Sequence, residues 1–152
     1  MSWSGGKICL VASVISCGAE TPNSFSSQTY LQDSGIVCLY ASSVLDNNEQ
    51  LFEAEQAITV LYKKADVCLS SNCTESLMAS CFVDDAGVIH SVATWRARDP
   101  SDEVCTDDCR LPQSVCYTSA LTAGEHTFSF GQDSVRISIP ESTDTPLCLL
   151  NM

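Results

Sequence analysis

Hydrophobic residues in this chain occur in short runs that are separated by polar, turn-forming segments. The runs GIVCLYA (35–41) and AITVLYK (57–63) are rich in β-branched and aromatic residues and have the length of β-strands. Near the C-terminus, Phe128 and Phe130 lie on one face of an alternating segment, which is typical of a half-buried antiparallel sheet. The pattern predicts strands at 35–41, 57–63, 80–85, 88–96, 115–121, 126–130 and 135–140.

The segments between these runs predict turns and loops. Asp85-Ala86-Gly87 separates two of the strands and predicts a hairpin. The segment DNNEQLFEAEQ (46–56) predicts a loop or a single helical turn, because a helix of two turns is hardly stable alone. A chain of 152 residues has room for one domain, and short strands with little helix predict an all-β fold, an antiparallel β-sandwich.

The chain contains 10 cysteines, well above ordinary usage. Exported proteins use cysteines as disulfides, whereas cytosolic proteins keep few exposed thiols. Zinc or an iron–sulfur cluster is the alternative, but C-x2-C is absent, and His90 and His126 lie in separate strand-like segments. The spacing therefore favours disulfides, and we expect no metal and no cofactor.

The first residues have the three parts of an export signal. MSWSGGK carries one positive charge, and the apolar run ICLVASVIS that follows it is too short to span a bilayer. Val14-Ile15-Ser16-Cys17 resembles the bacterial lipobox. That resemblance implies cleavage before Cys17 and acylation of its sulfur. The alternatives are a signal peptide without a lipid, or a first strand at 8–16 with Cys17 in a disulfide.

This interpretation divides the chain into a signal peptide (1–16), a lipidated N-terminus with a flexible tether (17–34) and a β-sandwich domain (35–148). Cleavage removes Cys9 and acylation uses Cys17, so an even number of cysteines remains to form disulfides. Sequence alone does not choose their pairing, but we expect a local bridge within 105–116 and a bridge from Cys148 to an earlier strand such as that of Cys38. The disulfide cysteines are Cys38, Cys68, Cys73, Cys81, Cys105, Cys109, Cys116 and Cys148.

Two neighbouring segments carry a family resemblance. CTDDCRLPQSVC (105–116), followed by LTAGEHTFSFGQDSVRISIP (121–140), is similar to the C-terminal part of small cysteine-rich lipoproteins of myxobacteria and related Gram-negative bacteria. In that family a C-x3-C-x6-C cluster precedes a strand of an immunoglobulin-like module. The resemblance covers about a third of the chain. It implies an immunoglobulin-like, disulfide-stapled β-sandwich in the cell envelope and attaches no activity to it.

Candidate sites are few. An acidic loop offers oxygen atoms that could bind Ca2+, but it lacks the D-x-[DN]-x-[DN]-G pattern and equally fits a solvated loop. Trp95 could be an exposed anchor for a partner or a glycan, or could pack over the core. No G-x-S-x-G motif or recognisable triad is present, so we expect no enzyme. The acidic candidates are Asp99, Asp102, Glu103, Asp107 and Asp108.

The formal net charge of −12 argues against nucleic acid or an anionic membrane surface as a partner. The leading hypothesis is a lipid-anchored binding or structural module of the cell envelope, held on the outer membrane through its lipid. Resemblance to enterobacterial lipoproteins, whose inner-membrane retention signals carry Asp at the position of Gly18, implies the outer membrane. Its partner is another envelope protein or a glycan. The alternative is a soluble secreted protein that binds a receptor or protease, in which case the Asn72-Cys73-Thr74 sequon has meaning, and an enzyme is third.

Overall fold

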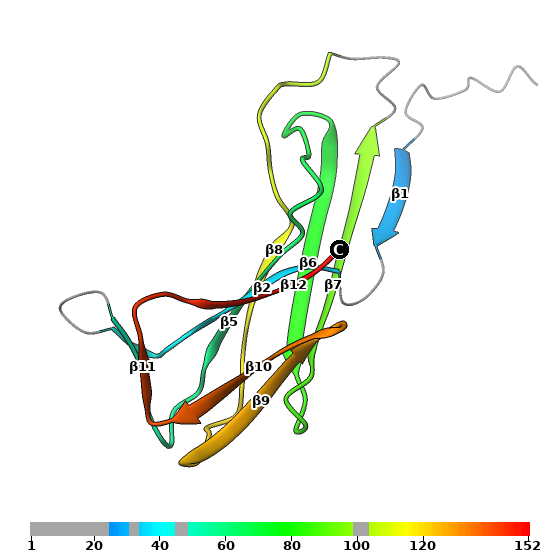
Figure 1. The fold of residues 1–152 in the computed structure, drawn as a ribbon. Coiled ribbons are helices and arrows are strands. Elements are labelled where there is room, and N and C mark those ends of the chain that lie inside the picture. Colours follow the sequence, from blue (N-terminus) through cyan, green and yellow to red (C-terminus); the bar gives the residue numbers. More distant parts are fainter. Residues whose placement is uncertain (1–24, 31–33, 45–48, 99–103) are drawn as a thin grey trace, which may run out of the picture.

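The computed structural model describes residues 25–30, 34–44, 49–98 and 104–152, which form β-strands and no helix (Figure 1). The prediction of an all-β fold is therefore confirmed. No helix in these ranges is long and apolar enough to cross a membrane. The strands are β1 (Phe25–Tyr30), β2 (Gly35–Tyr40), β3 (Ser43–Val44), β4 (Gln50–Phe52), β5 (Thr59–Lys63), β6 (Thr74–Val83), β7 (Ile89–Arg98), β8 (Gln113–Tyr117), β9 (Gly124–Phe130), β10 (Asp133–Ile139), β11 (Glu141–Thr143) and β12 (Leu147–Asn151).

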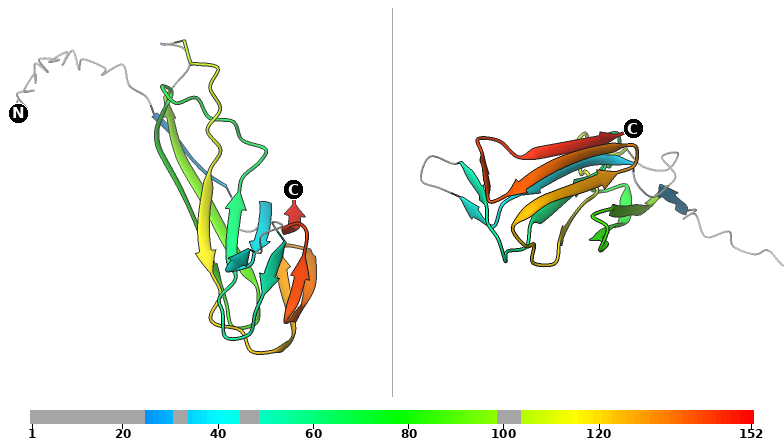
Figure 2. Two further views of the ribbon diagram at one scale, coloured as in Figure 1. Left: turned by 90° about the vertical axis from the view of Figure 1, so that its left-hand side faces the viewer. Right: turned by 60° about the horizontal axis from the view of Figure 1, so that its bottom comes forward.

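The strands pair into antiparallel sheets with the orders β12-β2-β5-β8, β1-β7-β6, β11-β4-β3 and β10-β9. The β6–β7 hairpin lies beside β8, as the left view of Figure 2 shows. The Cα atoms of Cys81 on β6 and Cys116 on β8 are 5.5 Å apart. A disulfide imposes a Cα separation of about 4.4–6.8 Å however its strands are arranged, but Cα atoms of β6 and β8 also lie within 8 Å of each other at positions away from the bridge. The two strands are therefore lateral neighbours, although no hydrogen-bonded ladder joins them.

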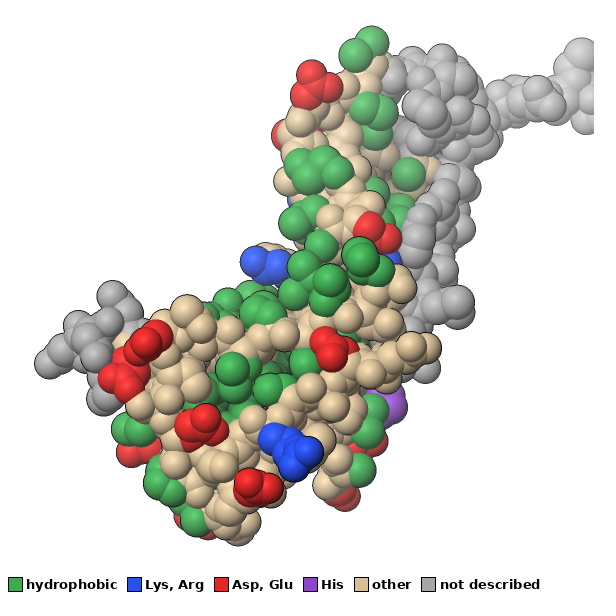
Figure 3. Space-filling model, viewed as in Figure 1, with side chains coloured by type: hydrophobic (Ala, Val, Ile, Leu, Met, Phe, Trp, Pro, Cys, Tyr) green, Lys and Arg blue, Asp and Glu red, His purple; other side chains and the backbone are tan. Residues whose placement is uncertain are grey.

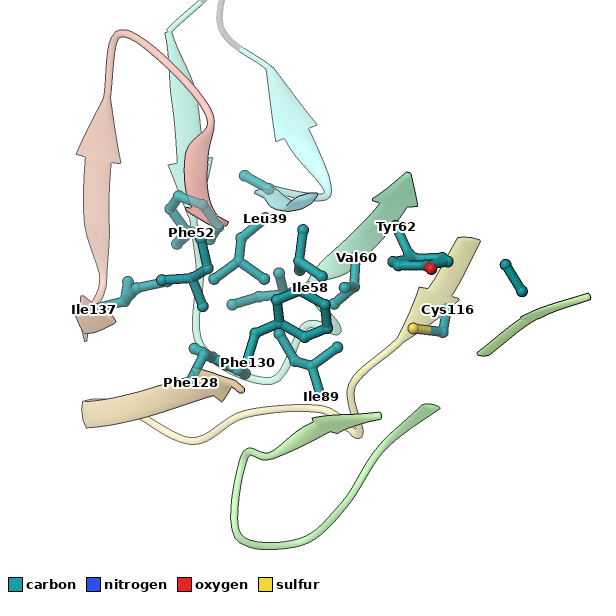
Figure 4. Packing of buried hydrophobic residues seen from close by; sticks show 14 of the residues in the cluster. Leu39, Phe52, Ile58, Val60, Tyr62, Ile89, Cys116, Phe128, Phe130 and Ile137 are labelled. Atoms are coloured by element: carbon teal, nitrogen blue, oxygen red, sulfur yellow. The ribbon is translucent and has the colours of Figure 1, made fainter. Parts of the chain in front are cut away.

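The hydrophobic core lies between the four-stranded sheet and the β9–β10 hairpin (Figure 4). Leu39 and Val60 enter it from β2 and β5, and Phe130 and Ile137 enter it from β9 and β10; each is at most 1% exposed. The alternation predicted for 126–130 and 135–140 is confirmed, because every second residue of these strands is buried.

The predicted hairpin at 85–87 is also confirmed. The Asp84 carboxylate accepts hydrogen bonds of 2.9 Å from the backbone N–H groups of both Ala86 and Val88. Gly87 has φ +79°, and a Cβ at this position would collide with the carbonyl oxygen of Thr127. This turn therefore requires glycine.

Three expectations of chain organisation are corrected. Phe25–Tyr30 lies within the expected tether of 17–34, but it forms β1 and pairs with β7 from Tyr30↔Ala93 to Phe25↔Arg98. Gln50–Phe52 lies within the expected loop or helical turn and forms β4, which pairs with β11. The last strand continues to Asn151, beyond the expected domain end at 148. The predicted signal peptide, with Cys9, and Cys17 lie outside the described residues.

All eight cysteines expected in disulfides are paired. The Cys38–Cys148 bridge joins β2 to β12 as expected. The expectation of a local bridge within 105–116 is wrong, because each cysteine of that cluster pairs with an earlier one. The segment around 110 lies along the segment around 69, and Leu69 and Arg110 exchange backbone hydrogen bonds of 3.1 and 2.8 Å. The other bridges are Cys68–Cys109, Cys73–Cys105 and Cys81–Cys116.

Candidate binding surface

Six neighbouring strands present one continuous surface on the side away from the core. We call this surface the outer face. It consists of the even-numbered residues of 36–40, 78–82, 90–94 and 148–150 and the odd-numbered residues of 59–63 and 113–117. The intervening residues point inward, and the Cys81–Cys116 bridge joins two of them across the seam between β6 and β8. The outer faces of the two sheets therefore lie on the same side of the molecule.

The outer face is largely apolar although half of it is open to solvent. Lys63 is its one Lys or Arg, and it includes no Asp or Glu, in a chain that contains 19 acidic residues. Large exposed apolar patches are uncommon on monomeric soluble proteins and commonly mark interaction sites. On the side drawn in Figure 3, hydrophobic side chains extend from the broad part along the narrow arm, with acidic side chains scattered around them. The most exposed apolar residues of the outer face are Met78 (69%), Tyr117 (63%), Phe82 (59%), Val115 (51%) and Leu150 (48%).

Two depressions interrupt this surface. One, of about 600 Å³, lies at the seam and is lined by Met78 and Gln113 among others. The second, of about 300 Å³, lies at the far edge and is lined by Ile36 and Leu150. Depressions of this kind can accept side chains of a partner, since anchoring residues at interfaces fill pockets.

One end of the outer face carries an aromatic pair with a charged neighbour. The rings of Phe82 and His90 stack with their centroids 4.6 Å apart. His90 Nε2 lies 3.1 Å from Asp84 Oδ2, and this hydrogen bond, together with those from the backbone, lowers the pKa of Asp84 below its ordinary value. These contacts hold the imidazole of His90 flat against the ring of Phe82, so the aromatic surface extends from β6 onto β7.

The segments that carry the acidic loop are held by a network around Asn72. The Asn72 side chain accepts a hydrogen bond of 2.9 Å from Thr106 N and donates one of 3.1 Å to the carbonyl oxygen of Val104. The carboxylate of Asp108 accepts hydrogen bonds from Ser71 N and from Thr106 Oγ1, and these lower its pKa. These hydrogen bonds join the segment 68–73 to the segment 104–109, which the Cys68–Cys109 and Cys73–Cys105 disulfides also connect.

The predicted calcium ligands are only partly placed by the structure. Asp107 and Asp108 are exposed, whereas Asp99, Asp102 and Glu103 lie outside the described residues. In the described ranges, no group of three His, Cys, Asp or Glu side chains is positioned to hold a metal ion.

Of the two placements considered for Trp95, packing over the core is confirmed and the exposed anchor is wrong. Trp95 is 4% exposed and belongs to the core, opposite Leu77 on β6. Among residues whose burial the structure describes, the exposed large aromatic positions are Phe82 and Tyr117, which sequence reasoning missed. A signal for them exists, because each directly follows a cysteine of a β-strand, and when the cysteine points inward its neighbour points outward.

A separate basin of about 260 Å³ lies between the β6–β7 turn and the start of β9. Asp84, Glu125 and His126 contribute to its walls. His126 Nε2 lies 2.7 Å from the carbonyl oxygen of Thr122, so this ring is held by the loop before β9. The basin is confined to the β6–β7 turn, the segment 118–121 and β9, whereas the outer face is continuous over six strands and is the stronger candidate site.

Comparisons of the chain with protein-family models, with curated proteins and with solved structures found no match.

Proposed function

We propose that this protein is a lipid-anchored module of the bacterial cell envelope that binds another macromolecule and does not catalyse a reaction. The outer face is the observation that carries the binding role. It is apolar, rigidly framed by strands and without a carboxylate, whereas a catalytic site normally joins titratable groups in a cleft. The envelope location is supported by the four disulfides, which are typical of exported proteins.

The proposed fold is an immunoglobulin-like β-sandwich. Support comes from the packing of the four-stranded sheet against the β9–β10 hairpin, with Leu39 and Phe130 among the buried residues between them. The resemblance of 105–140 to cysteine-rich lipoproteins of myxobacteria supports the same assignment. Sandwiches of this type commonly serve as recognition modules with no chemistry of their own.

Lipid attachment is tested by expressing the full chain in a Gram-negative host with a labelled fatty acid. The wild type is expected to incorporate label and to partition into a detergent phase, and Cys17→Ala is expected to do neither. Ser16→Ala keeps a small residue before the cysteine and is the matched control that retains the label. Equal partitioning of wild type and Cys17→Ala into the aqueous phase would exclude the anchor.

The alternative is a soluble secreted protein that binds a receptor or a protease. The observation that favours it is the exposed Asn72, which begins a glycosylation sequon. Mass spectrometry of the protein from its native source separates the two proposals, because acylation of Cys17 supports the first and a glycan on Asn72 supports the second.

A further inference from the structure

The geometry of the outer face points to its occupant: we propose that it docks a folded protein of net positive charge through an apolar patch on that protein. This inference rests on the proposed binding function and names the chemistry of the partner.

The area fits a protein better than a small molecule. Six strands at about 4.8 Å spacing and five residues at about 3.3 Å rise cover roughly 29 by 16 Å, which is about 460 Å² in projection. That is more than half of the ~800 Å² that one partner buries in a standard protein–protein interface. Side-chain relief and the rim supply the remainder, whereas a small ligand would leave most of the face in water.

The sequence of the strands indicates that both of their faces are meant to be covered. In β2, Val37 and Leu39 are buried in the core, yet Ile36 and Cys38 on the opposite side are also apolar. Near-continuous apolar runs are typical of strands buried on both faces. Within the described ranges only the inner face of this sheet packs against another hairpin, so the outer face is the side that a partner covers.

The net negative charge of the chain favours a basic protein as the partner over an acidic protein or an anionic membrane. The chain carries 19 acidic and 7 basic residues, and none of the residues that form the outer face is Asp or Glu. Two carboxylates border this face, because Asp66 lines the edge depression and Asp84 lies 3.1 Å from His90. These carboxylates and the surrounding negative field attract a basic protein. A second copy of the chain carries the same net charge of −12 and is repelled, as is an anionic membrane.

The two depressions give the interface its anchor points. Gln113 of β8 lines the seam depression and Ile36 of β2 lines the edge depression. Both of these residues pair with Lys63 of β5, so β5 separates the two depressions. Large side chains of the partner fill both depressions, and Tyr117, 63% exposed at the other end of β8, supplies a third contact.

The test uses full-length protein and a designed hairpin peptide as the probe. One face of the hairpin carries Val, Ile and Tyr, and its flanks carry Lys; a matched hairpin carries Glu instead. Titration calorimetry at low salt is expected to show saturable binding of the Lys hairpin at least about tenfold tighter than of the Glu hairpin. The difference is expected to shrink as added salt screens the charges.

Substitutions locate the binding surface. Val115→Asp and Met78→Asp place a carboxylate on the outer face and are expected to weaken binding of the Lys hairpin at least about tenfold. Val104→Asp is the matched control, because Val104 is 92% exposed and lies off the outer face. Thermal melts test whether all variants fold. We expect them to fold, because the substituted residues are exposed.

Four results would overturn the inference: no saturable binding up to about 1 mM peptide, equal affinity for both hairpins, binding insensitive to Val115→Asp, or a Val115-dependent self-association in sedimentation. Binding to lipid vesicles that Val115→Asp abolishes would likewise assign the face to a membrane. Lipid labelling at Cys17 is measured in a separate experiment. If the protein is labelled but binds neither hairpin, this inference is wrong and the proposed envelope location still stands.

Discussion

Removal of the Cys38–Cys148 bridge tests how the disulfides stabilise the fold. Both sulfur atoms lie on the outer face, where Cys148 is exposed and Cys38 half-buried. Replacing both residues by alanine therefore removes little packing. The expected effect comes from the unfolded chain, which gains conformational freedom when the cross-link is lost.

The magnitude follows from the path that remains between the two positions. With the other bridges intact, the shortest connection runs from 38 to 68, across to 109 and on to 148, about 69 residues, and the chain-entropy relation then gives about 4.4 kcal/mol. Removal of Cys68–Cys109, whose residues are both exposed, leaves a path through Cys73–Cys105 of about 9 residues and costs about 2.6 kcal/mol. The two double alanine variants should thus differ by about 1.8 kcal/mol, because the bridges are nested.

Guanidinium chloride unfolding measures both values, with fluorescence of the buried Trp95 as the signal and Trp3→Phe as the common background. Peptide mapping without reduction verifies that the remaining bridges are unchanged in each variant. The reasoning is refuted if loss of Cys38–Cys148 costs no more free energy of unfolding than loss of Cys68–Cys109.

Three further predictions concern the turn, the core and acid stability. The His90 hydrogen bond lowers the pKa of Asp84 below 3.8, so its contribution to stability is present above that pH and is lost as the pH falls through the lowered value; between pH 6 and pH 3, Asp84→Asn should lose less stability than the wild type in urea unfolding. Phe130→Ala should cost about 3–5 kcal/mol in chemical unfolding, because the ring is fully buried, whereas Phe82→Ala at a 59% exposed position should cost far less. Gly87→Ala should destabilise the fold by more than about 1 kcal/mol and lower its melting temperature, because of the positive φ and the Thr127 carbonyl, and Ala86→Gly in the same turn is the control that should cost less.

The sequence predicted the strands best where one face is buried and the other polar. Phe128 and Phe130 alternate with polar residues, and both enter the core as expected. β1 escaped prediction because FSSQTY is polar, and the pairing of this strand with β7 depends on backbone hydrogen bonds rather than on a hydrophobic pattern. The residue types of this segment therefore do not predict that it forms a strand of the sheet.

The disulfide pairing and the candidate site were predicted only in part. Cys38 and Cys148 lie in flanking strands of one sheet, so their pairing follows from the expectation that the chain end is tied to an early strand. The partners of Cys105 and Cys109 depend on how the segment 105–110 lies against the segment 68–73. The spacing of cysteines along the sequence does not predict this contact. The placement of Trp95 stayed open between the core and the surface because an aromatic residue of a strand can face either way, and its burial opposite Leu77 shows that it faces inward.

The disulfides and the outer face are connected through the seam between β6 and β8. Backbone hydrogen bonds hold β8 to β5 and β6 to β7, but no ladder crosses from β6 to β8 in the described residues. The Cys81–Cys116 bridge fixes these strands at one strand spacing, and its sulfur atoms lie on the inner side. A sheet whose two halves are joined by a bridge in its interior keeps its solvent side free for contact. The bridge therefore also serves the proposed binding role, because it holds together at the seam the two sheets that form the outer face.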